Sequence, residues 1–346
     1  MKNDIKDYGL EALRGYLKKH NQPAYRAQQI LSWVFQKRIH SFSSMENIPR
    51  DVRQALEHDF SISQFSAQTV ARSSDGTHKF LFLLDDGNAI ESVYIPEEKR
   101  NTICVSSQVG CRYGCVFCAS SKCGFVRSLT QAEILNQVMF IMDAFAQRRI
   151  SNIVFMGIGE PLDNYDVVRA VIDVMNAPWG FGIGQRKITI STAGVIEGIR
   201  RLAHEGLQVE LSVSLHSADD TKRSALMPLN KKYPLSQLLP ALKEFCRLTK
   251  RRITFEYMLL GGYNCLKEDA ECLVHALKGI HCSVNLIAYN AVAGTGFSSP
   301  TKKEILFFKG YVEKHGFEVT LRKSRGQDID AACGQLRLRH HSNKSS

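Results

Sequence analysis

Hydrophobic positions over residues 1–60 recur with the period of an α-helix. The positions that share a helical face are Leu10, Leu13 and Leu17, followed after a break at Pro23 by Ile30, Trp33 and Val34. Basic and aromatic residues are interleaved here, which suits either an RNA-facing surface or an amphipathic helix with a solvated basic face. The pattern predicts a small N-terminal helical domain.

Between residues 61 and 96 the hydrophobic period shortens to two. The stretch HKFLFLLDDGNAIESVYIP contains two strand-like runs around Asp86 and Gly87, which are a turn signal. We therefore expect a β-hairpin that leads into the main domain.

Strand-like and helix-length segments alternate along the remainder of the chain. The strand-like segments are TICVSS, NIVFMG, KITIST, VELSVSLH, ITFEYMLL, SVNLIAYN and FEVTLRK. One helix is expected over residues 130–147, where Thr130 and Glu133 fit a capping box. Roughly six βα units predict an α/β fold whose parallel sheet is a partial or full barrel, or else doubly wound. In each case functional side chains should lie at the carboxyl ends of the strands.

The charge and the cysteine content narrow the class of protein. A formal charge of +11 and a pI of about 9.2 favour a polyanionic partner, although a basic surface without such a partner would have the same composition. The N-terminal MKNDIKDYGLEALRGYLKK lacks the apolar core of a signal peptide, and no apolar run is long enough to cross a bilayer. Ten cysteines in 346 residues are too sparse for a disulfide scaffold. We expect reduced thiols, a cytoplasmic location and no membrane partner.

Four of the cysteines are concentrated in CRYGCVFCASSKCG, as Cys111, Cys115, Cys118 and Cys123. A disulfide knot conflicts with the composition, which leaves a zinc site or an iron–sulfur cluster. Structural zinc usually has paired C-x2-C ligands and four protein donors. The spacing C-x3-C-x2-C instead suits three irons of a 4Fe–4S cluster, with the fourth iron open to another ligand. Cys123 is a candidate for that fourth ligand on spacing alone.

Several motifs together resemble a known family. C-x3-C-x2-C with Phe117 before its last cysteine resembles the radical S-adenosylmethionine (SAM) superfamily, and MGIGEP (156–161) resembles the SAM-binding segment of that superfamily. The stretches CVSSQVGC (104–111), SLHS (214–217) and RGQDIDAACGQL (325–336) narrow the resemblance to the RlmN/Cfr family of RNA adenosine methyltransferases, over about residues 20–336. The resemblance implies a 4Fe–4S cluster on Cys111, Cys115 and Cys118. It gives no role to Cys123.

The resemblance also implies a mechanism with two SAM molecules per turnover. Carbon 2 of adenine is a C–H carbon that polar methyl transfer cannot reach, so a radical route is required. Cys333 matches the cysteine that accepts a methyl group from the first SAM. The radical from the second SAM removes hydrogen from this S-methyl group, whose carbon then bonds to adenine and forms a covalent protein–RNA adduct. Cys104 matches the cysteine that resolves the adduct through a disulfide with Cys333, and Glu91 matches the general base.

Further site residues and partners follow from the same resemblance. The residues that match SAM contacts all lie at the ends of predicted strands, and they are Gly159, Glu160, Ser191, Ser214, Leu215, His216 and Asn290. The implied substrates are 23S rRNA at position 2503 and tRNA at position 37. The implied electron donor is a flavodoxin-like reductant.

Two alternatives remain, one for the carbon of adenosine that is methylated and one for the class of protein. Cfr-type relatives methylate carbon 8 of the same rRNA adenosine, but the form RGQDIDAACGQL favours carbon 2, because Cfr-like sequences have a shortened stretch there. A non-catalytic iron–sulfur or zinc RNA-binding protein would share the basic charge and the cysteines. The expected division is an RNA-binding helical domain (1–60), a hairpin linker with the general base (61–96), a barrel (97–328), and a C-terminal segment with the catalytic cysteine and a basic tail (329–346).

Overall fold

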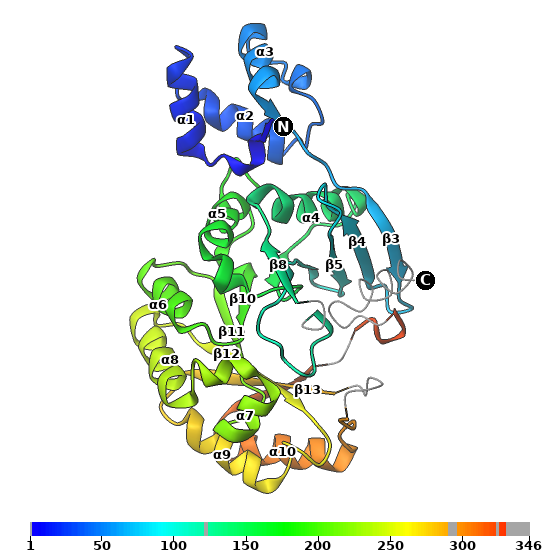
Figure 1. Ribbon diagram of the computed structural model, residues 1–346, viewed down its shortest axis with the longest axis vertical. Coiled ribbons are helices and arrows are strands. Elements are labelled where there is room, and N and C mark those ends of the chain that lie inside the picture. The colour runs from blue at the N-terminus through cyan, green and yellow to red at the C-terminus, as the bar shows by residue number, and fades with distance from the viewer. Residues whose placement is uncertain (1, 121–123, 290–295, 323–324, 330–346) are drawn as a thin grey trace.

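The computed structural model describes residues 2–120, 124–289, 296–322 and 325–329, and its centre is a ten-stranded mixed sheet (Figure 1). The strand order is β14-β13-β12-β11-β10-β9-β6-β5-β4-β3. From β6 to β14 all neighbours are parallel, whereas β5, β4 and β3 continue the sheet in antiparallel fashion.

The strands of this sheet are β3 (Ala67–Arg72), β4 (His78–Leu83), β5 (Ala89–Pro96), β6 (Asn101–Cys104), β9 (Asn152–Phe155), β10 (Ile188–Thr192), β11 (Glu210–Ser214), β12 (Ile253–Leu259), β13 (Cys282–Ala288) and β14 (Glu318–Arg322). The helices around it are α4 (Gln131–Ala144), α5 (Tyr165–Asn176), α6 (Ile196–His204), α7 (Asp220–Leu226), α8 (Leu235–Thr249), α9 (Lys267–Leu277) and α10 (Lys302–Lys314). The N-terminal helices are α1 (Leu10–Lys19), α2 (Arg26–Phe35) and α3 (Arg50–Asp59). Two short sheets pair β1 (Asn3–Asp4) with β2 (Phe60–Ser61) and β7 (Gln108–Gly110) with β8 (Phe125–Ser128). Short 3-10 helices are η1 (Ile5–Asp7), η2 (Phe42–Ser44), η4 (Pro161–Asn164), η5 (Gln185–Lys187), η6 (Pro228–Lys231) and η7 (Gln327–Ile329).

The predicted α/β barrel is confirmed in its partial form. All seven strand-like segments of the main domain form strands, and β14 and β3 are the two edges of the sheet within the described residues. The predicted hairpin is also present, as β4 and β5. It is joined to the barrel strands through the β5–β6 pair, and β3, which the sequence analysis did not anticipate, extends it.

Helix α4 begins as the sequence predicts. The Thr130 hydroxyl accepts the Glu133 backbone N–H at 3.2 Å, and the Glu133 carboxylate accepts the Thr130 N–H at 2.9 Å, which completes a capping box. The helix ends at Ala144 and not at residue 147. The next residue, Phe145, has φ −122° and ψ 40°, which are not helical, and its ring stacks on Tyr94 of β5 at a centroid distance of 3.9 Å.

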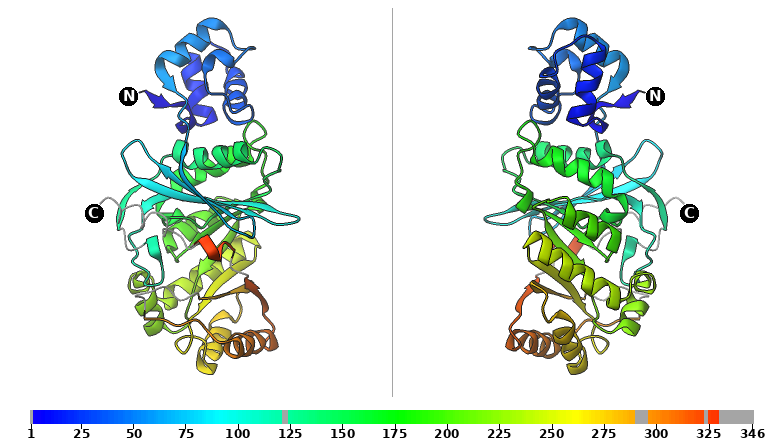
Figure 2. Two further views of the ribbon diagram at one scale, coloured as in Figure 1. Left: turned by 90° about the vertical axis from the view of Figure 1, so that its right-hand side faces the viewer. Right: turned by 90° about the vertical axis from the view of Figure 1, so that its left-hand side faces the viewer.

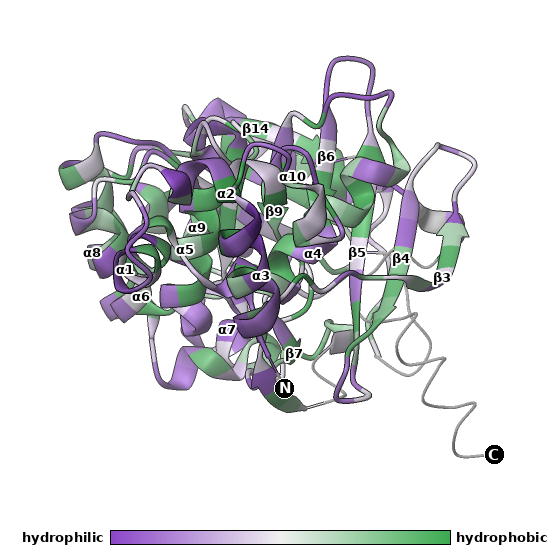
Figure 3. Ribbon diagram, turned by 90° about the horizontal axis from the view of Figure 1, so that it is seen from above, coloured by the Kyte–Doolittle hydropathy of each residue, from purple (hydrophilic) through white to green (hydrophobic). Residues whose placement is uncertain are grey.

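One face of the sheet packs against the helices and the other face is an inner wall. On β12 the helix-facing side chains of Ile253, Phe255 and Tyr257 are fully buried, whereas Glu256 points to the opposite face. Hydrophobic residues gather in the middle of the molecule and hydrophilic residues on its outer loops (Figure 3). Side chains directly opposite one another on paired strands share a face, so the register identifies every residue of the inner wall.

The N-terminal helices form a separate small layer at one end of the barrel (Figures 1 and 2). Their buried side chains include the predicted Leu13, Leu17, Ile30 and Val34. Among the residues that the structure describes, none of the helices has the length and apolar character that a membrane span requires.

Gln137 of α4 joins the segment that follows β6 to strand β5. Its side chain is fully buried, and its Oε1 accepts the Ser106 backbone N–H at 2.8 Å and the Ser92 hydroxyl at 2.6 Å. Its Nε2 donates to the Ser106 carbonyl oxygen at 3.0 Å. One amide thus satisfies polar groups of β5 and of the segment that follows β6.

We expect Gln137→Leu to lower the free energy of unfolding by about 2 to 3 kcal/mol, because it leaves buried donors without acceptors. Urea denaturation measures this change. The exposed Gln54→Leu in α3 is the matched control and should stay within about 0.5 kcal/mol of the wild type. Equal stabilities of the two variants would contradict the role of Gln137.

Candidate active site

Four of the predicted site residues lie on the inner wall of the sheet. Val93 on β5 is directly opposite Cys104 on β6, so Glu91 is the diagonal neighbour of Cys104 on the same face. The same register continues through β9 to Ser191 on β10 and to Ser214 on β11. The structure therefore brings Glu91, Cys104, Ser191 and Ser214 to one surface.

Glu91 is buried and forms an ion pair. Its Oε2 lies 3.5 Å from Nζ of Lys79 on β4, and the two side chains are 4% and 1% exposed. Its backbone carbonyl oxygen accepts the Ser106 hydroxyl at 2.6 Å. Sequence reasoning missed Lys79, because the structure buries four consecutive residues of β4, from Lys79 to Phe82, and a period-two pattern does not predict this.

The Cys104 thiol is in a low-polarity environment with nearby charges. Burial raises the pKa of Cys104 to about 11, an effect that the positive charges of Arg322 and Lys79 oppose and the negative charge of Glu91 increases. Cys104 is thus close to Glu91, Lys79 and Arg322, from three different strands. At neutral pH its thiol is protonated.

The loop that carries Cys111, Cys115 and Cys118 is anchored at two points and has one internal turn. The Cys111 N–H donates to the Gly124 carbonyl oxygen at 3.1 Å, the Val116 N–H to Leu226 at 3.0 Å, and the Cys118 N–H to Cys115 at 3.0 Å. The first anchor needs Gly110, which has φ +73° and whose Cβ, if present, would lie 1.7 Å from the Gly124 oxygen. The loop follows the carboxyl end of β6, as the sequence predicts.

The three thiols lie near enough to influence one another. Burial raises the pKa of Cys111 to about 11 and the pKa of Cys115 further, and in both cases a neighbouring thiolate would add to the increase. Binding of a positive metal centre would offset this repulsion and release the protons. In the described part of the chain, no three His, Cys, Asp or Glu side chains converge on a point suited to one metal ion. A 4Fe–4S cluster requires no such point, because each thiolate binds a separate iron, and the three-thiol donor set fits this cluster.

Gly159 and Glu160 follow β9, and their backbone packs against Gln108 in the segment after β6. Gly159 has φ +102°, and a Cβ on it would lie 2.5 Å from Cβ of Gln108. The Glu160 N–H donates to Oε1 of Gln108 at 2.9 Å, and its carboxylate accepts the Ala193 N–H at 2.7 Å and the Leu162 N–H at 3.1 Å. Burial raises the pKa of Glu160 to about 7, although these backbone donors oppose the increase.

His216 is a buried neutral imidazole that fixes the end of β11. Its backbone is left-handed, with φ 55°, and its Nδ1 accepts the Met258 N–H at 3.0 Å, so Nε2 carries the hydrogen. Its ring meets Phe117 of the cysteine loop edge to face, at 4.7 Å between centroids. Burial, aided by the charge of Arg223, lowers the pKa of His216 to about 3.

Arg223 of α7 is a second residue that sequence reasoning missed. Its fully buried guanidinium donates to the carbonyl oxygens of Ala193 at 2.8 Å and of Ser214 and Leu215 at 3.2 Å each. Burial lowers the pKa of Arg223 to about 10, whereas a nearby Cys115 thiolate favours the charged form. The arginine thus joins the ends of β10 and β11 beside the cysteine loop. Nothing in the local sequence pattern distinguishes it from a surface arginine.

The other predicted residues divide into two groups. Leu215 is fully buried next to Ser214, and both lie at the carboxyl end of β11. Asn290, Cys333 and Cys123 lie outside the described residues.

A parallel partial barrel with a three-cysteine loop after β6 and a glycine–glutamate turn after β9 is the arrangement expected of a radical SAM protein. The family model "Radical SAM superfamily" matches residues 105–270, and "Ribosomal RNA large subunit methyltransferase N-terminal domain" matches residues 3–62. Membership of the superfamily implies a 4Fe–4S cluster and SAM as cofactors.

Relatives cover nearly the whole chain. Proteins named "Probable dual-specificity RNA methyltransferase RlmN" from Clostridium botulinum (strain Alaska E43 / Type E3) and Clostridium perfringens (strain 13 / Type A) are each 46% identical over 97% of this chain, and over 96% and 97% of their own lengths. The crystal structure of a radical SAM methyltransferase from Sphaerobacter thermophilus has a TM-score of 0.90 and 38% identity, and covers 96% of this chain and 98% of its own. The chain belongs to the RlmN family of radical SAM RNA methyltransferases.

The low pKa of His216 predicts a specific pH dependence of stability. The unfolded chain takes up a proton on this histidine below about pH 6.5, whereas the folded state does not until about pH 3. The free energy of unfolding should therefore fall as the pH drops through this window. Between pH 7.5 and 5 the contribution of His216 amounts to about 2 kcal/mol.

Urea denaturation of the wild type and of His216→Asn at both pH values isolates this contribution. Asparagine can still accept the Met258 N–H but does not titrate, so the variant should lose about 2 kcal/mol less than the wild type on acidification. An identical pH dependence of the two proteins would show that His216 is charged or exposed in the folded state.

Proposed function

We propose that this protein methylates carbon 2 of adenosine, at position 2503 of 23S rRNA and at position 37 of tRNA, and that it acts in the cytoplasm. The observation that carries the proposal is the diagonal pairing of Glu91 with Cys104 on the inner wall, because it puts a base and a thiol next to each other on one surface that an adduct could occupy. The relatives that match nearly the whole chain are named as dual-specificity RNA methyltransferases, which agrees with two RNA substrates.

In this proposal Cys111, Cys115 and Cys118 hold the 4Fe–4S cluster. When bound and reduced by a flavodoxin-like protein, the cluster supplies the electron that cleaves SAM and produces a 5'-deoxyadenosyl radical. The SAM site consists of Gly159, Glu160, Ser191, Ser214, Leu215, His216 and Asn290. Two SAM molecules are used per turnover, one as the methyl donor and one as the source of the radical.

The side chains of this protein then carry the one-carbon unit and the protons. The Cys333 thiol loses its proton and takes the methyl group of the first SAM. After hydrogen abstraction from this S-methyl group, its carbon bonds to carbon 2 of adenine. The radical adduct then loses the carbon 2 proton, which Glu91 accepts, and one electron, which an oxidised one-electron carrier such as the flavodoxin-like protein would take up. The ion pair with Lys79 holds the Glu91 carboxylate in place on the inner wall.

Cys104 completes the reaction by thiol–disulfide chemistry. Its thiolate attacks the sulfur of Cys333, the bond from that sulfur to the one-carbon unit breaks, and the carbon keeps the electron pair and takes up a proton as the new methyl group. A Cys104–Cys333 disulfide remains, and two electrons from a cellular thiol reductant restore both thiols. Because Cys104 is buried with a raised pKa, its proton must first pass to a nearby base.

We further propose that residues 1–60 are an accessory RNA-binding domain, that 61–96 carry the base into the barrel, that 97–328 are the catalytic barrel, and that 329–346 bring Cys333 to the inner wall. Arg322 supports this division, because the last strand ends with a residue whose charge acts on Cys104. The carboxyl end of β14 is therefore close to the predicted resolving thiol.

Methylation of rRNA and tRNA fragments in vitro by the reconstituted protein tests the proposed product. We expect 2-methyladenosine in nuclease digests of both RNAs analysed by mass spectrometry. Exclusive formation of 8-methyladenosine would replace the proposal by the Cfr-type reaction. A protein that binds RNA and contains metal but never cleaves SAM would instead be a non-catalytic RNA-binding protein.

Cys104→Ala should trap the protein on its substrate. Cys333 methylation and addition to adenine do not need Cys104, but release does, so the variant should accumulate a protein–RNA crosslink through Cys333. A denaturing gel of the protein from cells should show a nuclease-sensitive shifted band that is absent when Cys333 is also replaced.

Cys265→Ala is the matched control, since this thiol is also buried. It donates hydrogen bonds to the Leu260 carbonyl oxygen and to the Glu304 carboxylate, away from the inner wall. This variant should turn over normally and give no shifted band. A Cys104→Ala protein that contains the cluster and behaves like this control would remove Cys104 from the mechanism.

A further inference from the structure

Two neighbouring hollows lie along the junction between the N-terminal helices and the barrel. The first, of about 440 Å³, is called here the aromatic pocket, and Trp33, Trp179, Gln28 and Gln29 are among its lining residues. The second, of about 690 Å³, is called the basic pocket, and it is lined by Arg38, Lys99, Arg148, Arg149 and Lys187 together with one acidic residue, Glu98. The two are consecutive, because Lys37 lines the first and Arg38 the second, and residues 178–184 contribute to both.

The junction that forms these hollows is firmly packed. The buried Phe35 ring contacts Trp179 at 6.1 Å and Phe181 at 5.9 Å between centroids, which joins α2 to the segment before β10. The Gln36 side chain donates to the Pro178 carbonyl oxygen, and Arg38 pairs with Asp143 at the end of α4. The two pockets are therefore parts of one preformed surface, and such domain junctions are frequent ligand sites.

The charges of the basic pocket are largely uncompensated. Arg38 is paired with Asp143, but Lys99, Arg148, Arg149 and Lys187 are exposed and form no carboxylate ion pair within the described residues. With Arg38 compensated by Asp143, four positive side chains remain with Glu98 as the one acidic residue of the lining, and the positive charges repel one another in the free protein. A bound polyanion would remove this repulsion and release its own counterions.

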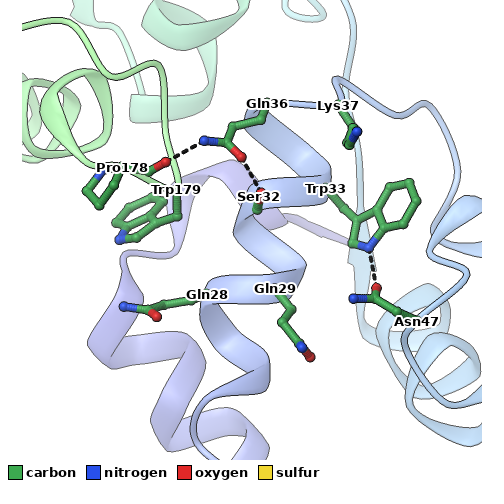
Figure 4. A pocket seen from close by; sticks show the side chains of 9 residues that line it. All are labelled: Gln28, Gln29, Ser32, Trp33, Gln36, Lys37, Asn47, Pro178 and Trp179. Atoms are coloured by element: carbon green, nitrogen blue, oxygen red, sulfur yellow. Dashed lines mark hydrogen bonds between the residues drawn. The ribbon is translucent and has the colours of Figure 1, made fainter.

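The aromatic pocket has the chemistry of a nucleobase site. In Figure 4, Trp179 and Trp33 lie on either side of α2, and the amide side chains of Gln28 and Gln29 extend from the same helix. The Trp33 indole N–H is held by Asn47 at 2.5 Å, which fixes the ring. Oε1 of Gln29 is buried and has no hydrogen-bond partner among the described residues. Aromatic faces for stacking beside free amide groups suit an unstacked base of RNA.

We propose that this junction surface is a second RNA-binding site, which holds phosphates in the basic pocket and an unpaired base in the aromatic pocket. The inference rests on the proposed function for the identity of the RNA. The basic pocket is formed where β6, β9 and β10 begin, whereas the cysteine loop and Glu160 follow the opposite ends of these strands. The surface thus grips RNA at a distance from the modified adenosine and contributes to substrate affinity, not to chemistry.

An acidic protein is the other polyanion that a basic surface could bind. An electron donor, however, has to approach the cysteine loop, and the basic pocket lies at the far end of the strands from that loop. The neighbouring aromatic pocket also has no use in binding carboxylates. Both observations favour RNA.

The test is the salt dependence of RNA affinity. In the holoenzyme, Lys99, Arg148, Arg149 and Lys187 are replaced together by Ala, and the Kd for a 23S rRNA fragment is measured by fluorescence anisotropy across NaCl concentrations. Each lost phosphate contact should reduce the slope of log Kd against log salt by about 0.7 to 0.9, and affinity at low salt should fall by roughly 10- to 100-fold. The kcat at saturating RNA should not change.

A matched control removes the same charge elsewhere. Lys243, Arg247, Lys302 and Lys303 are exposed on α8 and α10 and form no ion pair in the described part of the chain, and their replacement by Ala should leave the salt slope near that of the wild type. If both quadruple variants change the salt slope equally, the change comes from the net charge of the protein and the proposed site is wrong. If the wild type does not methylate RNA at all, the proposed function fails, whereas the binding comparison still decides the surface.

Gln29→Leu tests the aromatic pocket separately. Its Oε1 has no partner to lose, so stability should not fall, while RNA affinity should weaken by roughly 3- to 10-fold. An unchanged Kd would show that the aromatic pocket does not bind a nucleobase. A basic-pocket variant that keeps its RNA affinity but is reduced slowly by flavodoxin, and normally by dithionite, would overturn the RNA assignment in favour of an acidic protein.

Discussion

The arrangement of the site depends on the close contact between the segment after β6 and the turn after β9. The Ser106 hydroxyl donates to the Glu91 carbonyl oxygen and accepts the Ile158 N–H at 2.9 Å, while Gln108 accepts the Glu160 N–H. This contact is possible only with glycine at two positions, since a Cβ at Gly157 would lie 2.7 Å from the Ser106 hydroxyl and one at Gly159 would clash with Gln108. The predicted base, the start of the cysteine loop and the glycine–glutamate turn are thereby held by one small set of bonds.

The inner wall differs from a barrel core by its buried charged and polar groups. Lys79 pairs with Glu91, Arg223 binds three carbonyl oxygens, and Glu256 of β12 accepts the Asn285 amide at 3.0 and 3.2 Å. Such groups cost free energy when they leave water, and apolar residues of similar size would pack without this cost. Their concentration on the wall and at the strand ends, while the helix-facing side is apolar, indicates that this surface is retained for binding and chemistry.

The N-terminal helices contact the barrel at two places. One is the start of α4, and the other is the segment before β10. Gln131 donates to the Lys6 carbonyl oxygen at 2.7 Å, and the Ala132 N–H donates to Asp7 at 2.8 Å, so η1 lies against the start of α4. Phe35 packs against Trp179 on the other side. Because α4 also carries Gln137, the same helix connects the accessory domain with the segment that leads to the cysteine loop. An RNA held at the junction would therefore have a fixed position relative to the inner wall.

The sequence by itself determined the features that depend on local pattern. Hydrophobic periodicity predicted the barrel strands and the N-terminal helices, the Thr130 capping box gave the start of α4, and the cysteine spacing and its flanking motifs identified the family. Only the tertiary structure decided that the sheet ends at β14 and β3 within the described residues, that the hairpin joins it with β3 as an extra strand, and that Lys79 and Arg223 belong to the site. The physical reason is that strand register and the burial of a charge depend on residues far away along the chain, and a local pattern contains no information about those partners.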